Sequence, residues 1–194
     1  MIIVGYQGIG KSTMVKNIYA PDSIDLESGN FWVDGKRAED WYKPYCKIAV
    51  HLSEQGYVVF TSSHEVVRNY LKEISSEPVV IVHPALELKD DWINKLEERY
   101  NQTKLDKDYK ALMNAKDRYS ENISELMNSG LCTKEIDSMD YSLQEIVENL
   151  LVDYSLAIRD TEWEHADYTA LEKYIPKVDL WIEKTNEEFH KLMK

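Results

Sequence analysis

The sequence has little of what a secreted or membrane-spanning protein needs. It contains two cysteines, Cys46 and Cys132, whose separation matches no common metal-ligand spacing. So few cysteines favour reduced thiols in a reducing compartment over a disulfide. No apolar run reaches the roughly 18 residues that a transmembrane helix needs. The first apolar stretch is too short for a signal-peptide core and lacks a basic segment before it. We therefore expect a cytoplasmic protein with no membrane partner.

Positive charge is also scarce. The chain has 23 lysines and arginines against 35 aspartates and glutamates, which gives a formal net charge of -12. Such a surface repels nucleic acid at long range, so we expect no nucleic-acid partner. A local group of cations in a cleft can still attract a small anion. The length of 194 residues and the 43% hydrophobic content suit one globular domain, with room for an appendage.

Glycine is rare, with seven residues in total, yet three of the seven occur within six positions. The segment GYQGIGKS, from Gly5 to Ser12, satisfies the pattern G-x-x-x-x-G-K-[ST] and follows a short apolar run. Glycines allow backbone N–H groups to surround phosphate oxygens, where a side chain would block the approach. We predict that this loop binds ATP with Mg²⁺. The residues predicted to contact the nucleotide are Gly5, Gly8, Ile9, Gly10, Lys11, Ser12 and Thr13.

The rest of the chain alternates short apolar runs with helical patterns. This alternation predicts an α/β fold in which helices cover both faces of a parallel sheet. A segment that begins at Lys134 predicts a strand, a turn and a helix capped by Ser142, with Glu145 at the capping-box position. Gly56 is expected to end the second helix. The other predicted strands are 1–4, 23–26, 57–62 and 78–84, and the other predicted helices are 9–18, 38–55, 64–74, 90–100 and 107–127.

With the glycine loop between a strand and a helix, residues 1–152 resemble the P-loop family of nucleoside monophosphate kinases and gluconate- or shikimate-type kinases. The resemblance implies a P-loop three-layer fold with about five strands in the order 2-3-1-4-5. It also implies an acceptor-binding arm at about 28–55 and a helical lid at about 86–130. Residues 153–194 lie outside the resemblance. Their aromatic, acidic composition and an amphipathic helical pattern from Pro176 predict a helical extension packed on the domain, with a homodimer surface as the alternative.

The second predicted strand ends in Asp25-Leu26-Glu27, which contains two acidic residues. The resemblance implies that Asp25 holds magnesium with Ser12 and that Glu27 contacts the acceptor. If the acceptor is a hydroxyl group, one of these acids would orient or deprotonate it. Two solvated acids at a strand end are the alternative. The third strand ends in FTSS, without the acid that many P-loop proteins carry there. The missing acid shifts the magnesium role toward Asp25 and makes a hydrolytic motor less favoured.

The segment GYVVFTSSHEVVRNYL resembles the gluconate-kinase-type turn that leads into a helix bearing arginine. Carried over, Arg68 would bind the anionic group of the acceptor, and Ser62, Ser63 and His64 would line the turn. Parallel-sheet proteins bind ligands at this carboxyl edge of the strands. His64 has an equal alternative, as a helix-start residue with a structural hydrogen bond.

The segment LELKDDWINKLEER resembles the lid of the nucleotide kinases, with Lys89, Lys95 and Arg99 as the matching cations. Lys95 and Arg99 are four residues apart and therefore share a helix face. Closure of such a lid expels water and neutralises developing charge. A solvated charged helix is the alternative. Arg118 lies in a densely charged helix, and we interpret it as solvated.

The arm contains FWVDGKR and a following helix with further aromatic residues. Aromatic faces stack on bases, and a guanidinium such as Arg37 can grip a monophosphate with two hydrogen bonds. This pairing of Trp32 with Arg37 favours a nucleotide acceptor. Trp41 and Tyr45 have a second interpretation, as the core stripe of the helix.

We therefore expect a kinase that transfers the γ-phosphoryl group of ATP to a small acceptor, with a nucleoside or deoxynucleoside monophosphate favoured. The alternatives are a kinase of a hydroxyl group on a small metabolite and a non-catalytic NTP-binding regulatory module. The predicted catalytic residues are Lys11, Asp25, Arg68 and Arg99. The predicted acceptor-binding residues are Glu27, Trp32, Arg37, Ser62, Ser63, His64, Arg68 and Lys95.

Overall fold

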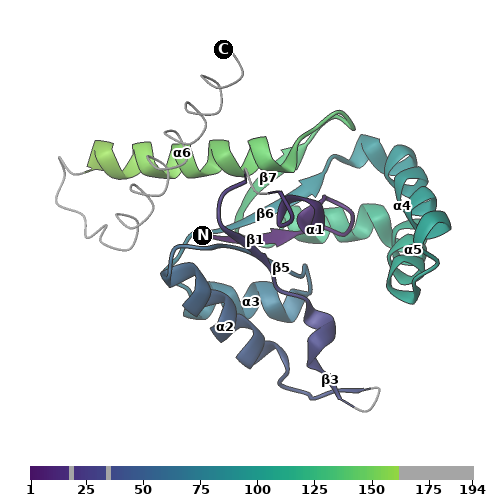
Figure 1. Ribbon diagram of the computed structural model, residues 1–194, viewed down its shortest axis with the longest axis horizontal. Helices are drawn as coiled ribbons and strands as arrows, with labels where there is room; N and C mark the ends of the chain where they lie inside the picture. The colour runs from purple at the N-terminus through teal and green to yellow at the C-terminus, as the bar shows by residue number, and fades with distance from the viewer. Residues whose placement is uncertain (18–19, 34–35, 162–194) are drawn as a thin grey trace.

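The computed structural model describes residues 1–17, 20–33 and 36–161. Its centre is a five-stranded sheet in which every neighbouring pair is parallel. The spatial order is β2-β5-β1-β6-β7, which is 2-3-1-4-5 when the five strands are counted along the chain (Figure 1). The predicted α/β class and strand order are therefore confirmed. The strands are β1 (Ile2–Gly5), β2 (Ser23–Asp25), β5 (Val58–Thr61), β6 (Val79–Pro84) and β7 (Cys132–Ile136).

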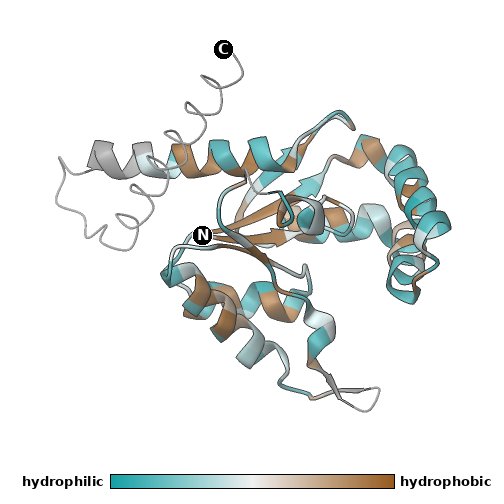
Figure 2. Ribbon diagram, in the orientation of Figure 1, coloured by the Kyte–Doolittle hydropathy of each residue, from teal (hydrophilic) through white to brown (hydrophobic). Residues whose placement is uncertain are grey.

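The central strands form because their sequences are apolar without alternation. All four residues of β1 and all four of β5 are buried, as expected of strands that are covered on both faces. Ile3 pairs with Phe60 on one side and with Val80 on the other. Figure 2 shows this apolar character concentrated on the strands, whereas the helices carry hydrophilic residues on their outer faces.

Helices cover both faces of the sheet. Right-handed crossovers would place α2, α3 and α5 on one face and α1 on the other, and α6 contacts α1. Figure 1 agrees, because α6 and the α2–α3 pair lie on opposite sides of the strands. The connection from β1 runs toward β2 and the connection from β5 runs toward β6, so the two leave in opposite directions along the sheet. A ligand crevice is therefore expected at the carboxyl end of β1. The helices are α1 (Lys11–Met14), α2 (Tyr42–Glu54), α3 (Glu65–Ile74), α4 (Lys89–Thr103), α5 (Asp106–Met127) and α6 (Leu143–Thr161).

The first helix is much shorter than predicted. The sequence predicted a helix over 9–18, but α1 is a single turn that ends at Met14. Met14 is buried, whereas the next three side chains, Val15, Lys16 and Asn17, are exposed. Among the described residues 15–17 no side chain packs into the core, so packing of these three does not extend the helix.

The acceptor arm also differs from its prediction. Before α2 the chain forms a 3-10 turn, η1 (Ser28–Phe31), and a two-stranded antiparallel hairpin of β3 (Trp32–Val33) and β4 (Lys36–Arg37). The second helix begins at Tyr42 rather than at residue 38, and a second 3-10 turn, η2 (Leu86–Leu88), precedes α4.

The predicted start of α6 and the predicted end of α2 are confirmed. Ser142 Oγ accepts a hydrogen bond of 3.3 Å from the backbone N–H of Glu145 and so caps α6. Gly56 follows α2 with a φ of 85°. Cys46 is buried, Cys132 is exposed, and both are free thiols. None of the helices in the described ranges has both the length and the apolar character to cross a membrane.

Helix α6 crosses the predicted carboxyl-terminal boundary of the main domain. We placed the end of the main domain at residue 152, but α6 passes through this position and continues to Thr161. The predicted helical extension over 153–194 therefore begins inside α6. The amphipathic pattern from Pro176 lies outside the described residues.

Candidate functional site

The glycine loop joins β1 to α1 at the carboxyl edge of the sheet. Gly8 and Gly10 have φ angles of 85° and 100°, which residues with a side chain rarely adopt. A Cβ added to Gly5 would lie 2.6 Å from Cδ1 of Ile9 and 2.9 Å from Cδ of Lys11. The backbone of the folded loop therefore favours glycine at Gly8 and Gly10, whereas a side chain at Gly5 would require the side chains of Ile9 and Lys11 to shift.

Lys11 lies folded back on this loop. Its Nζ donates a hydrogen bond of 3.1 Å to the carbonyl oxygen of Gly5. Burial lowers the pKa of Lys11, while the charges of Asp25 and Glu27 raise the pKa and the charge of Arg99 lowers it. A partly desolvated ammonium group beside another cation attracts an anion strongly.

Ser12 and Asp25 meet directly. Ser12 Oγ donates a hydrogen bond of 2.7 Å to Oδ2 of Asp25, the last residue of β2. A hydroxyl and a carboxylate are hard oxygen ligands of the kind that Mg²⁺ binds together with substrate phosphates. Within the described ranges, no group of three or more His, Cys, Asp or Glu residues is arranged to hold a metal ion. The pair therefore fits Mg²⁺ that arrives with a nucleotide and shares its phosphate oxygens.

Tyr45 joins the carboxyl ends of two strands. Its hydroxyl donates a hydrogen bond of 2.7 Å to the carbonyl of Leu26, just after β2. The same oxygen accepts a hydrogen bond of 2.8 Å from the backbone N–H of Ser62, just after β5. Tyr45 is also fully buried, as its core interpretation predicted. The positioning role of its hydroxyl was missed, although a tyrosine in an apolar stripe is a signal that its O–H has a partner.

His64 and Trp41 contact each other just after β5. His64 Nδ1 is 3.0 Å from Ser62 Oγ, and its ring meets the ring of Trp41 edge-on with centroids 5.4 Å apart. Trp41 also packs against Phe31 and Tyr45 and is 9% exposed. These contacts support a structural hydrogen bond for His64 and a core position for Trp41.

Helix α4 is tied to the glycine loop through Trp92. The indole Nε1 donates a hydrogen bond of 2.9 Å to the carbonyl of Gln7, and the ring stacks on Tyr141 at a centroid distance of 5.9 Å. Lys95 Nζ lies 4.4 Å from the Trp92 ring centroid and 4.6 Å from that of Tyr141, and it donates to the Tyr141 hydroxyl at 2.8 Å. Burial, followed by the charge of Arg99, lowers the pKa of Lys95. Lys95 is therefore held beside the loop rather than extended into solvent.

Arg99 forms an ion pair with Asp108 of α5. Asp108 is 2% exposed and also accepts a hydrogen bond of 2.6 Å from Thr103 Oγ1. The charge of Arg99 lowers the pKa of both Lys11 and Lys95, so these three cations lie close enough to interact. Lys89, the third predicted lid cation, is exposed at the start of α4.

Glu27 forms an ion pair with a lysine of α5. Its Oε1 lies 3.2 Å from Nζ of Lys107, in the first turn of α5. Both side chains are about half exposed. This ion pair links the loop after β2 to the predicted lid.

Arg68 is buried at 5% exposure in the first turns of α3. Its guanidinium donates a hydrogen bond to the carbonyl of Ser63, and burial lowers its pKa. Within the described part of the chain, no acceptor lies within reach of its Nε. Trp32 and Arg37 lie on the β3–β4 hairpin, but their side chains are outside the described set.

The chain matches no model of a known protein family, and no curated protein matches its sequence.

Proposed function

We propose that this protein is a P-loop kinase that transfers the γ-phosphoryl group of ATP to a small acceptor, with a nucleoside or deoxynucleoside monophosphate favoured. The observation that carries the proposal is the hydrogen bond between Ser12 and Asp25 beside the glycine loop. It brings a hydroxyl and a carboxylate together at the carboxyl edge of a 2-3-1-4-5 parallel sheet. This arrangement suits magnesium-dependent phosphate chemistry.

The roles follow from the contacts. The amides of the glycine loop and Lys11 would hold the donor phosphates. Ser12 and Asp25 would hold Mg²⁺, which supplies positive charge to the phosphate oxygens. Lys95 and Arg99 would add positive charge from α4, and Arg99 would exchange its partner Asp108 for a phosphate oxygen. Phosphoryl transfer of this kind needs positioning and charge rather than covalent help from the protein.

The ion pair of Glu27 favours a phosphate acceptor over a hydroxyl acceptor. The Glu27 carboxylate that would take a proton from a hydroxyl acceptor already contacts Nζ of Lys107 at 3.2 Å. A monophosphate is already an anion and needs no base, whereas a sugar hydroxyl benefits from one. Glu27 would then bind or orient the acceptor.

The test is a panel of acceptors incubated with ATP and Mg²⁺, with products identified by mass. The panel contains nucleoside monophosphates, deoxynucleoside monophosphates and hydroxyl acids, and it compares wild type with Lys11→Ala and Glu27→Gln. Lys16→Ala is the matched control, because Lys16 is an exposed lysine next to the loop.

We expect transfer to a monophosphate, with a loss of about 10²–10³-fold in Lys11→Ala, little change in Glu27→Gln and no change in Lys16→Ala. Transfer only to a hydroxyl acid, abolished by Glu27→Gln, would establish the hydroxyl-kinase alternative instead. If Lys11→Ala changed neither ATP affinity nor transfer to any acceptor, the regulatory-module alternative would replace the proposal.

A further inference from the structure

Helix α5 changes direction at Arg118. This residue has φ -135° and ψ 20°, far from helical values, although α5 contains neither proline nor glycine. The part before the bend packs beside α4. In the part after it, Tyr119, Ile123 and Leu126 are buried, and the Tyr119 hydroxyl donates a hydrogen bond of 2.8 Å to the carbonyl of Ala85. The bend therefore joins the part of α5 that packs beside α4 to a part that is anchored on the sheet.

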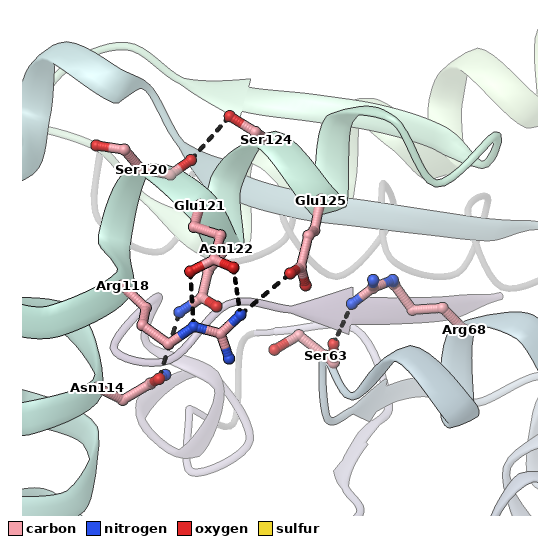
Figure 3. Close-up of polar contacts among 9 residues, drawn as sticks. All are labelled: Ser63, Arg68, Asn114, Arg118, Ser120, Glu121, Asn122, Ser124 and Glu125. Carbon is pink, nitrogen blue, oxygen red and sulfur yellow. Dashed lines mark hydrogen bonds and ion pairs between the residues drawn. The ribbon is translucent and has the colours of Figure 1, made fainter.

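Polar side chains hold this bend (Figure 3). Arg118 Nε donates to Glu121 Oε2 at 2.8 Å, and one terminal nitrogen donates to Glu125 Oε1 at 3.2 Å. Asn122 Nδ2 donates across the bend to Asn114 Oδ1 at 3.4 Å. The sequence interpretation of Arg118 as a solvated residue was incomplete. The side chain is about half exposed, but its guanidinium folds toward the anchored part of α5.

Glu125 faces two guanidinium groups. Besides its contact with Arg118, its charge acts on Arg68, whose pKa it raises against the effect of burial. Figure 3 shows the Glu125 carboxylate in the space between Arg118 and the Ser63–Arg68 pair. No carboxylate of the described residues lies within ion-pair distance of Arg68. A buried guanidinium with an unsatisfied Nε is suited to an anion that offers two oxygens in one plane.

We propose that Arg118 is the second guanidinium of the acceptor-anion site and that Glu125 is an internal carboxylate which an anionic acceptor must displace from between Arg68 and Arg118. Two guanidiniums match the charge of a phosphomonoester dianion, whereas a carboxylate monoanion satisfies only one. Glu125 is about half exposed, so its displacement into water costs little. The identity of the anion as the acceptor's phosphate rests on the proposed function.

The test measures binding of inorganic phosphate to the full chain by calorimetry at constant ionic strength. A non-hydrolysable ATP analogue and Mg²⁺ are present to fill the donor loop. Wild type is compared with Glu125→Gln, Arg118→Gln and the double variant. Glu121→Gln is the matched control, because it removes the same charge from a residue that also pairs with Arg118. Unlike Glu125, Glu121 is not among the charges that shift the pKa of Arg68.

We expect phosphate to bind about three- to fivefold more tightly to Glu125→Gln and at least fivefold more weakly to Arg118→Gln. Glu121→Gln should change the affinity less than twofold, and the double variant should lose the gain of Glu125→Gln. The proposal is wrong if Glu125→Gln binds phosphate no more tightly than wild type, or if Glu121→Gln gives an equal gain through net charge alone.

Two further measurements keep this test separate from folding and from the proposed function. Circular dichroism shows whether Arg118→Gln keeps the helix content of wild type. If Arg118→Gln unfolds, the phosphate affinity of Glu125→Gln still decides the proposal. Affinity for the ATP analogue is measured first. If the analogue does not bind, the kinase proposal fails, while the phosphate affinities still show whether Arg68 and Arg118 form an anion site.

Discussion

Substitution of Gly8 by alanine should separate backbone strain in the glycine loop from packing of the loop against α4. Gly8 has a φ of 85°, so any side chain incurs a conformational cost of about 1–2 kcal/mol. In addition, the new Cβ would lie 3.0 Å from Cδ2 of Leu96 and 3.3 Å from Nε1 of Trp92. Both neighbours are almost completely buried and have little room to move. Overpacking of this kind costs about 1–3 kcal/mol.

Gly10 provides the matched comparison in the same loop. Its φ is 100°, so Gly10→Ala incurs a similar backbone cost, but the nearest atom to its new Cβ is Leu143 Cβ at 3.9 Å. We therefore expect Gly8→Ala to lower the free energy of unfolding by about 2–5 kcal/mol and Gly10→Ala by about 1–2 kcal/mol. For a chain of this length each kcal/mol corresponds to about 2–4 °C in Tm.

The assay is urea denaturation followed by circular dichroism, with Leu96→Val added to complete a double-mutant cycle. Shortening Leu96 removes the methyl group that the new Cβ meets at 3.0 Å. Leu96→Val should therefore recover about 1 kcal/mol of the loss in Gly8→Ala and none of the loss in Gly10→Ala. Equal losses in the two glycine variants, or an additive cycle with Leu96→Val, would refute the packing argument.

Three further predictions concern other contacts of the site. Tyr45→Phe leaves a carbonyl and an N–H without their shared partner, and we expect it to lower the free energy of unfolding by about 1–3 kcal/mol in urea denaturation. Asp108→Asn removes the buried charge that pairs with Arg99 and should cost a similar amount, with a Tm lowered by several degrees in calorimetry. Lys11→Met should be more stable than wild type near pH 7 without added nucleotide, because burial lowers the lysine pKa in the folded state. Wild type gains stability as the pH rises through that lowered pKa, so the advantage of Lys11→Met should shrink toward alkaline pH in denaturation measured from pH 7 to 10.

The sequence predicted the parts of the fold that short-range patterns determine. Unbroken apolar runs gave the sheet, and Ser142 and Gly56 marked a helix start and a helix end at their observed positions. The resemblance implied that Ser12 and Asp25 hold Mg²⁺ together, which stays a prediction, and Ser12 Oγ lies 2.7 Å from Asp25 Oδ2. Local sequence patterns do not predict this approach, because Ser12 lies in α1 and Asp25 ends β2.

Other features of the structure have no pattern in the sequence that predicts them. The bend at Arg118 contains neither proline nor glycine, and the part of α5 after it is fixed by a contact between Tyr119 and Ala85, which are 34 residues apart. The burial of Arg68 against Ser63 depends on how α3 packs. The one-turn length of α1 depends on the exposure of the residues after Met14, which helix propensity alone does not reveal.

The contact between Trp92 and Gln7 gives the protein a built-in optical reporter. The indole donates its N–H to a carbonyl of the glycine loop, while its ring stacks on Tyr141 and lies under the ammonium of Lys95. Any ligand that rearranges the loop or draws Lys95 away changes the electric field at this ring. Trp41 packs instead against His64, just before α3. Variants that retain one tryptophan at a time would thus let changes at the glycine loop and changes beside His64 be followed separately by fluorescence, with no added label.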